Sequence, residues 1–328
     1  MVSMKEIAKK LNISRCTVSN ILNNKLDTHK YKEETIKLVR DTAKEMGYVS
    51  NIIAKSLKTG RTGTIAIVVP DIANTFYINI IKSLEKKSYL SGYNLIICAA
   101  EEQVEKEDNI LLMLQSRMID GVLISPVSYT RSIKGNYSYP IVCFDRKVKN
   151  DKYPSIIINN KEITQQAIEL IIKKGAREIL FLAGDPEDFS VVERLKGYKN
   201  ALAKNNLDFD SRRVIYEIYD EKVAYEKMCK LVKDNDISFD SIFISTNYFI
   251  YGVIKALYEN EVAIENIIGF EKFMEADFAF KNIPKVIQPE NEIAERAFNR
   301  LISEIKGEKS ENRIEIVPAF IECNNGYI

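Results

Sequence analysis

The sequence predicts an all-α head that contains a helix-turn-helix, followed by an α/β body of mainly parallel sheets arranged in two lobes. Three observations support this fold class. Residues 1–61 hold 13 Lys and Arg against 6 Asp and Glu, whereas the rest of the chain holds 34 against 40. The head has short amphipathic helical segments separated by tight turns, and the body alternates strand-like and helix-like segments. A basic head on an acidic body indicates that the head meets a polyanion and the body does not.

The length and composition narrow the class of protein. A chain of 328 residues suggests two or three domains with ample buried core. The first residues lack the apolar run of a signal peptide, and no stretch approaches the roughly 20 apolar residues of a membrane helix. The five cysteines are scattered without a Cys-x-x-Cys pair, which favours reduced thiols. We therefore expect a cytoplasmic protein with no membrane partner.

Three helices are expected in the head, over residues 4–11, 14–22 and 33–46. Ser3 followed by Glu6 forms a capping box that opens the first helix. Ser14 caps the second after a tight turn, and Gly47 ends the third. Two short helices joined by such a turn are typical of a helix-turn-helix.

The second helix of this motif enters the major groove of DNA. Its sequence exposes Arg15, Cys16 and Asn20, and suits Arg15 to a guanine edge and Asn20 to an adenine edge. The hydroxyl side chains suited to phosphates are those of Ser14, Thr17 and Ser19. The alternative is that these residues form only the polar face of a surface helix.

The head resembles the start of a lactose-repressor (LacI/GalR) family regulator. The run from Met4 to Ser14, MKEIAKKLNIS, carries the likeness, which continues to about residue 323. Further matching segments are Thr17–Ser19, Leu22-Asn23, Glu33–Thr35, Met46–Tyr48 and Asn51–Gly60. The loop from Asn24 to Lys32 departs from the family: it is longer, holds the single histidine His29, and ends in Lys32 where the family commonly has a capping Ser.

Residues 50–59 are too short to form a stable helix alone, because nucleation costs more than so few hydrogen bonds return. The resemblance implies that this hinge orders against its twin in a dimer and against the DNA minor groove. Leu57 is then the wedge that kinks a base step, and Ala54 allows close approach. The expected DNA contacts of the hinge are Asn51, Ala54, Lys55, Leu57 and Lys58. The alternative is a plain linker with an incidental leucine.

The body is expected to alternate strands and helices. The strands are expected over 65–69, 94–98, 121–124, 141–144, 155–158, 179–182, 242–244 and 266–269. The helices are expected over 77–90, 104–116, 161–174, 191–205, 221–234, 249–260 and 290–306. Such alternation predicts mainly parallel sheets with helices on both faces, here in two lobes facing a cleft. The resemblance implies a periplasmic-binding-protein-like fold for this part.

The expected domains are a head over 1–49, a hinge over 50–61 and an effector-binding and dimerisation body over 62–328. The first lobe is expected over about 62–160 and 290–315, and the second over about 161–288 and 316–328.

Ligands of such sheets bind beyond the carboxyl ends of the strands. Phe76 and Tyr77 are placed there to stack on a sugar face, and Arg194 matches a family arginine that typically binds an effector hydroxyl or carboxylate. The expected effector site comprises Phe76, Tyr77, Asp145, Asn159, Arg194, Asn247, Tyr248, Glu271 and Gln288.

Three of these residues stand where the family commonly has Asp: Asn159, Tyr248 and Glu271. Two cleft carboxylates are thereby lost while Arg194 is kept, and a buried arginine needs a partner. This change predicts an anionic guest, a sugar acid or sugar phosphate, in preference to a neutral sugar.

An enzyme is the first alternative, and the sequence argues against it. No GxGxxG motif follows a strand, no phosphate-binding GxxxxGK[ST] motif is present, and the single His29 lies in the head. The adjacent Glu101 and Glu102 are expected to be solvated surface carboxylates. We therefore expect no catalysis, no cofactor and no metal site.

The sequence thus predicts a homodimeric transcriptional regulator, in the first instance a repressor, that binds a near-palindromic duplex operator. A small carbohydrate-type effector between the lobes would change their angle and so the operator affinity. A repressor that senses a partner protein remains open, and a transport binding protein is disfavoured by the basic head and the lack of a signal peptide.

Overall fold

The computed structural model describes residues 2–22, 31–48, 60–149, 152–234, 236–264, 266–270, 284–308, 311–323 and 326–327. These residues form two compact units, Met1–Thr62 and Gly63–Ile328. Several expected residues lie outside the described ranges: His29, Asn51, Ala54, Lys55, Leu57, Lys58 and Glu271. Within the described ranges, no helix is both long and apolar enough to cross a membrane.

The first unit contains the three expected helices, α1 (Met4–Leu11), α2 (Arg15–Leu22) and α3 (Glu33–Glu45). The capping box of α1 is present, because the Ser3 backbone N–H donates to Glu6 Oε2 at 2.7 Å and Glu6 N–H donates back to Ser3 Oγ. Lys32 makes no side-chain cap at α3. Ile7, Val18, Ile21 and Val39 are fully buried and form the core of this unit.

The first lobe of the second unit is a six-stranded parallel sheet in the order β11-β5-β4-β3-β1-β2. Its strands are β1 (Thr64–Val69), β2 (Asn94–Ala99), β3 (Gly121–Ile124), β4 (Ile141–Phe144), β5 (Ser155–Ile158) and β11 (Ile314–Val317). Its helices are α5 (Thr75–Leu90), α6 (Val104–Ser116) and α12 (Glu290–Lys306).

Strand β1 explains how the helices cover this sheet. Its residues point alternately to the two faces, as in any strand. Ile65 and Ile67 belong to the same core cluster as α5 and α12, whereas Ala66 and Val68 belong to the cluster that includes α6. The sheet is therefore buried on both sides, which accounts for the unbroken apolar sequence of β1.

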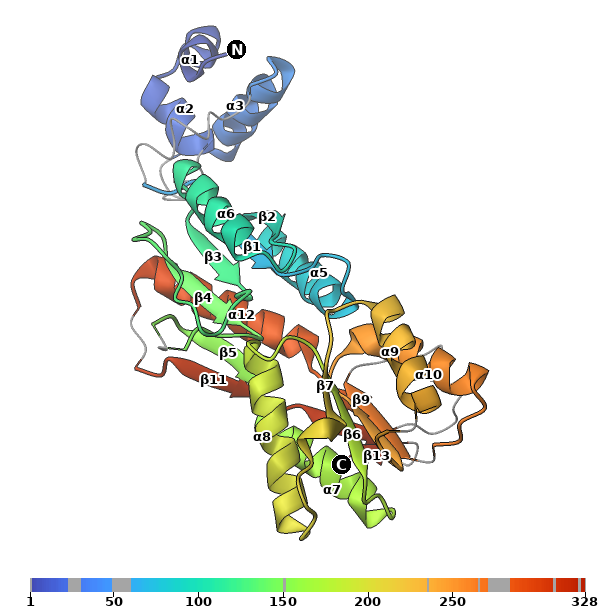
Figure 1. Ribbon diagram of the computed structural model, residues 1–328. Helices are drawn as coiled ribbons and strands as arrows, with labels where there is room; N and C mark the ends of the chain where they lie inside the picture. Colours follow the sequence, from blue (N-terminus) through green and yellow to red (C-terminus); the bar gives the residue numbers. More distant parts are fainter. Residues whose placement is uncertain are drawn as a thin grey trace. The chain divides into compact units, whose positions relative to one another are not determined.

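The second lobe is a seven-stranded sheet in the order β13-β12-β10-β9-β8-β6-β7, antiparallel only at β12. Its strands are β6 (Ile179–Ala183), β7 (Val214–Tyr216), β8 (Ser241–Ile244), β9 (Asn266–Phe270), β10 (Lys285–Ile287), β12 (Phe320–Cys323) and β13 (Gly326–Tyr327). Its helices are α7 (Asn160–Lys173), α8 (Phe189–Lys204), η1 (Ser211–Arg213), α9 (Glu221–Asp234), η2 (Asn247–Phe249) and α10 (Ile250–Glu259). Figure 1 shows α7 and α8 on one side of this sheet and α9 and α10 on the other. The predicted class, a helical head followed by an α/β body with helices on both faces of its sheets, is confirmed.

Five short strands were not anticipated from the sequence: β7, β10, β11, β12 and β13. β7 and β11 lie at sheet edges and are only partly buried, so they lack the continuous apolar run that marks a central strand. The chain passes between the two sheets after β5, after β10 and after β11. These three crossings bring the carboxyl ends of strands from both lobes to one pocket.

Candidate functional site

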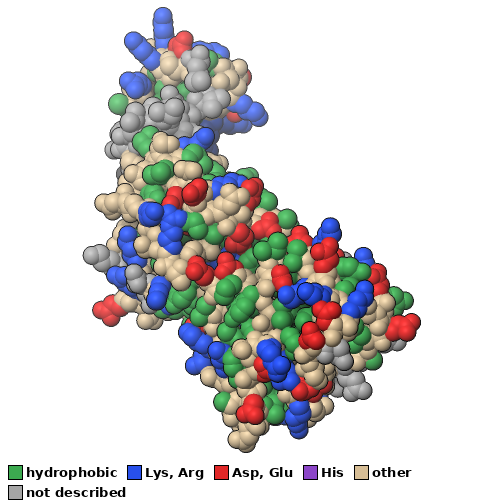
Figure 2. Space-filling model, viewed as in Figure 1, with side chains coloured by type: hydrophobic (Ala, Val, Ile, Leu, Met, Phe, Trp, Pro, Cys, Tyr) green, Lys and Arg blue, Asp and Glu red, His purple; other side chains and the backbone are tan. Residues whose placement is uncertain are grey.

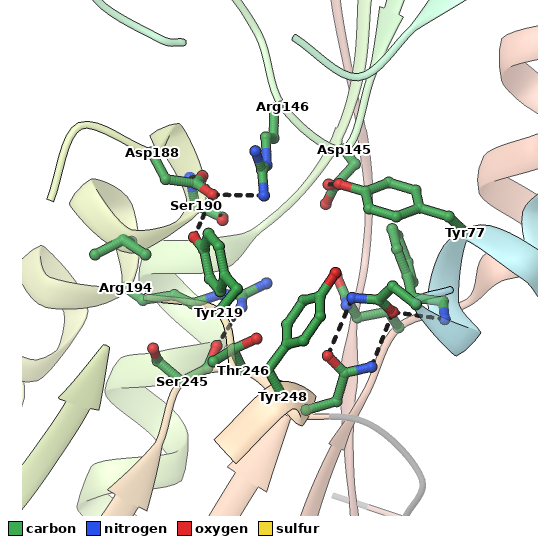
Figure 3. Close-up of a pocket in the computed structure, with 15 residues that line it drawn as sticks. Tyr77, Asp145, Arg146, Asp188, Ser190, Arg194, Tyr219, Ser245, Thr246 and Tyr248 are labelled. Carbon is green, nitrogen blue, oxygen red and sulfur yellow. Dashed lines mark hydrogen bonds and ion pairs between the residues drawn. The ribbon is translucent and has the colours of Figure 1, made fainter. Parts of the chain in front are cut away.

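The pocket lies where strand carboxyl ends of the two lobes face each other (Figure 3). The first lobe contributes residues that follow β1 and β4, and the second contributes residues that follow β6, β7, β8 and β10. The lining residues are Asn74, Phe76, Tyr77, Asp145, Arg146, Asp188, Ser190, Val191, Arg194, Tyr219, Ser245, Thr246, Asn247, Tyr248 and Gln288. Crevices at this position are the usual ligand sites of open α/β sheets.

Asp145 is presented by a tight turn directly after β4. Its φ of 61° is in the left-handed region, and the Arg146 N–H donates to the Phe144 carbonyl at 2.6 Å. Aspartate adopts this region more readily than most non-glycine residues, so the turn can present a carboxylate at this position. Tyr77 donates its hydroxyl proton to Asp145 at 2.8 Å. Burial raises the pKa of Asp145 even though Arg146 opposes the shift.

Arg146 and Asp188 form a buried ion pair across the pocket, with 2.9 Å between the Nη2 and Oδ2 atoms. Asp188 is the N-cap of α8 and also accepts a hydrogen bond from the Tyr219 hydroxyl at 2.6 Å. Burial disfavours the ionised form of Asp188, but Arg146, Tyr219 and Ser190 together lower its pKa below the usual value. Figure 3 shows this group along one side of the pocket.

Arg194 is fixed by three elements of the second lobe. Its Nε donates to Asn160 Oδ1 at 2.8 Å, and its Nη1 donates to the Ser245 carbonyl. The guanidinium lies 3.5 Å from the centre of the Phe270 ring. Gly197 permits this geometry, because a Cβ atom there would lie 2.3 Å from the Lys161 carbonyl oxygen of α7. These contacts hold the Arg194 side chain in place. Only 6% of the surface of the residue is exposed.

A buried hydroxyl group in the pocket points to a ligand. The Ser245 Oγ is fully buried and has no hydrogen-bond partner among the residues that the structure describes. Buried hydroxyl groups are nearly always paired, so an orphan in a pocket marks a place where a guest or water completes the set. Ser245 follows β8 and stands beside Thr246, which also lines the pocket.

The pocket is closed by direct bonds between the lobes. Tyr248 of η2 donates its hydroxyl proton to Asp71 Oδ2 at 2.6 Å, and the side-chain amides of Asn247 and Asn74 bond each other at 2.9 and 3.2 Å. The remaining cavity is about 40 Å³, room for a few waters but not for a sugar. A guest must therefore replace some of these bonds.

Seven of the nine predicted effector residues line this pocket. Asn159 is wrong as a pocket residue: its Oδ1 accepts the Ala319 N–H at 2.8 Å and so ties β5 to the returning chain. Glu271 lies outside the described residues. The residues that the structure brings together are mostly those that follow a long apolar strand, whose end is visible in the sequence.

Asp188 and Tyr219 were not expected from the sequence, and Arg146 was not among the expected effector residues. Asp188 and Ser190 form an N-cap pattern just after β6, a signal that was available in the sequence. Tyr219 follows β7, a three-residue edge strand without a clear pattern, so nothing marked it.

The pocket contains a carboxylate, that of Asp188, which was not expected from the sequence. Asp145 and Asp188 both line the pocket and balance Arg146 and Arg194, so carboxylates are not depleted there. Glu102 was expected to be solvated, but it accepts two 3.0 Å hydrogen bonds from Arg146. Asp188 and Glu102 were not expected here because their partner, Arg146, is distant in the sequence.

Helix α2 carries the expected DNA-reading residues on the head. Arg15 and Cys16 are exposed, and Ser14 caps the helix by accepting the Thr17 N–H at 3.0 Å. Asn20 is not exposed as expected: it is half-buried and its amide donates to the Tyr31 hydroxyl at 3.0 Å. Figure 2 shows several Lys and Arg side chains on the visible face of the head.

No group of three or more His, Cys, Asp or Glu side chains in the described parts of the chain is arranged to hold a metal ion.

Comparison with known proteins gives consistent matches along the whole chain. Residues 3–51 match the family described as bacterial regulatory proteins, lacI family. Residues 62–319 match periplasmic binding proteins and sugar binding domain of LacI family. The transcriptional regulator RegA of Clostridium saccharobutylicum is 30% identical over 307 residues, which cover 92% of this chain and 91% of RegA.

Two solved structures share the fold. The Lac repressor bound to ONPG in the repressed state has a TM-score of 0.83 at 17% identity and covers 98% of both chains. The transcriptional regulator CelR in complex with cellobiose has a TM-score of 0.72 at 22% identity, over 99% of this chain and 100% of CelR. These relatives are named as transcriptional regulators or repressors, not as enzymes.

Proposed function

The chain belongs to the LacI family of bacterial transcriptional regulators, and from this we propose that it is a homodimeric repressor. Its affinity for a near-palindromic operator is set by a carbohydrate-type effector. Family membership makes it a DNA-binding regulator with a ligand-binding body. The effector class, the dimer and the operator symmetry are the proposal, and a cytoplasmic location follows from the DNA partner.

The pocket between the lobes is the observation that carries this proposal. It combines two arginines, two carboxylates and several hydroxyl and amide groups around a space bounded by aromatic rings. Sites with aromatic walls and a few convergent polar groups suit small organic ligands. The orphan Ser245 Oγ and the rigid Arg194 supply hydrogen bonds that a ring bearing several hydroxyl groups can satisfy.

Among the carbohydrate classes, a neutral sugar suits this pocket better than a sugar acid or a sugar phosphate. Asp188 is held ionised beside Arg146, so one of the two pocket arginines is already neutralised. A second anion would face both Asp188 and Asp145. Like charges at close range in a buried site are costly. The relatives bound to ONPG and to cellobiose support a carbohydrate-type effector.

The interlobe bonds suggest how the effector acts on DNA. A guest that displaces the Tyr248–Asp71 bond or the Asn247–Asn74 pair changes the angle between the lobes. In a dimer this change alters the spacing of the two chains that lead to the heads. Coupling between such sites is typically about 1–3 kcal/mol, a 5- to 150-fold change in operator affinity.

A dimer is supported by apolar surface on the first lobe. Strand β2 is a sheet edge, and large apolar side chains on β2, α5, α6 and the loop after α6 are unusually exposed. They include Ile78, Tyr89, Leu90, Ile97, Leu112 and Met118. Exposed apolar surface beside an unpaired strand edge is typical of a protein interface.

The head supports operator recognition by α2, with Arg15 and Cys16 presented to the groove and Ser14, Thr17 and Ser19 near the backbone phosphates. Asn20 must give up its bond to Tyr31 in order to reach an adenine edge. The hinge contacts proposed from the sequence, Asn51, Ala54, Lys55, Leu57 and Lys58, lie outside the described residues.

Selection of duplexes from a random library, followed by fluorescence anisotropy at near-physiological salt, tests the proposal. We expect enrichment of a near-palindrome with two half-sites, and a shift in its affinity with one member of a panel of sugars, sugar acids and sugar phosphates. A protein corepressor is the second candidate, and it is favoured if the operator is found but no small molecule changes its affinity. No preference for any duplex over bulk DNA, with or without ligands, overturns the proposal.

A further inference from the structure

A second and larger cavity adjoins the pocket. It is an open groove of about 530 Å³ between the lobes, within the size range of small-ligand sites. The first lobe contributes Glu102 and Val127, and the second contributes residues after β6 and β7. The second-lobe residues are Gly184, Asp185, Pro186, Tyr216, Glu217, Ile218 and Tyr219.

Tyr219 is the wall that the pocket and the groove share. Its ring lies directly on the backbone of Gly184, where a Cβ atom would come within 2.0 Å of a ring carbon. Its hydroxyl is held by Asp188, and the Arg146 guanidinium lies 5.6 Å from the ring centre. The two cavities therefore join when a ligand displaces the Asp188–Tyr219 hydrogen bond.

The groove presents the chemistry of a surface that recognises hydroxylated rings. Tyr216 and Ile218 expose 38% and 68% of their surface and form an apolar platform beside Tyr219. Three carboxylates border this platform, those of Glu102, Asp185 and Glu217. Ionised carboxylates are strong acceptors for hydroxyl protons.

The charge of the groove limits what it accepts. The nine lining residues include three acidic side chains and no Lys or Arg. Arg146 and Lys227 neutralise Glu102 and Glu217 from outside the lining. A phosphate or carboxylate on the distal part of a ligand would therefore find these two cations already paired and no Lys or Arg in the lining.

We propose that this groove is a second sugar subsite, so that the effector is a neutral disaccharide or longer glycoside with one ring in the pocket and the next on Tyr216 and Ile218. The inference rests on the proposed function of the pocket. It explains why a cramped pocket stands beside a roomy groove, and why Gly184 leaves space for the Tyr219 ring between them.

Isothermal titration calorimetry on the full chain tests the subsite with matched probes: glucose against maltose and cellobiose, and galactose against lactose. We expect at least one disaccharide to bind about tenfold tighter than its monosaccharide, the effect of one well-placed aromatic contact. Tyr216→Ala should reduce this ratio to near one. Ile218→Ser, at a more exposed position, should lower it as well and guards against a folding defect in the first variant.

Tyr258→Ala is the matched control, because Tyr258 is an exposed tyrosine of α10 outside the groove, and this variant should keep the full ratio. Monosaccharides that bind as tightly as their disaccharides, or a ratio that survives both groove variants, overturn the subsite but leave the pocket standing. If no sugar of either size binds, the carbohydrate function itself fails and the subsite fails with it.

Discussion

Arg194→Ala separates the role of the pocket from the role of the head. The substitution removes two charge-assisted hydrogen bonds, to Asn160 and to the Ser245 carbonyl, and the stacking on Phe270. Such hydrogen bonds are each worth about 1.5–3 kcal/mol. Asn160 and Ser245 are buried and would lose their partners.

We therefore expect the free energy of unfolding to fall by about 4 kcal/mol, which lowers the melting temperature of the body by roughly 10 °C. The free energy of unfolding of native proteins is about 5–15 kcal/mol, so the variant should remain folded at 25 °C. The effector response should be lost, whereas operator affinity without effector should change little because Arg194 lies in the body.

The assay combines thermal shift with operator anisotropy, each with and without the sugar panel, on three variants. Arg194→Lys keeps the charge but not the planar guanidinium, so it should recover less than half of the lost stability and little of the response. Lys196→Ala is the control on the same helix, since it removes only an exposed ion pair with Glu193. An intact effector response in Arg194→Ala would refute the placement of this arginine at the ligand.

Three further predictions address other parts of the chain. Leu57→Ala should weaken operator binding about tenfold or more, because a wedge at a kinked step is worth a few kcal/mol, with effector affinity unchanged by calorimetry; unaltered operator affinity removes the wedge role. Burial raises the pKa of Glu107 from 4.5 to about 7, although its bond to the Val127 N–H opposes the shift. The penalty for the charged form is therefore absent below pH 4.5 and complete above pH 7. Glu107→Gln should exceed the wild type in urea-unfolding stability at pH 8 by up to about 3 kcal/mol, and the gain should vanish toward pH 4.5; a pH-independent difference contradicts this. Gly197→Ala should destabilise the second lobe by about 1–3 kcal/mol in thermal unfolding, because the new Cβ meets the Lys161 carbonyl at 2.3 Å, and an unchanged melting temperature would show that α7 and α8 separate freely.

Several parts of the protein could be predicted from the sequence because their signals are local. The capping box at Ser3 and Glu6, the Ser14 cap and the long apolar strands depend on neighbouring residues, so their patterns can be read directly. Because ligands bind beyond strand ends, the central strands also located most of the pocket, including Tyr77 and Arg194.

The contacts between polar groups, in contrast, depend on how the two lobes pack. Arg146 selects Asp188 and Glu102 as partners across 42 and 44 positions of sequence, and Tyr248 reaches Asp71 of the other lobe. No periodicity marks such pairs, because their free energy arises from burial and distance after the sheets have assembled. Asn159 likewise lies outside the pocket because its side chain accepts a hydrogen bond from the Ala319 N–H. The charge balance of the site therefore depends on the fold.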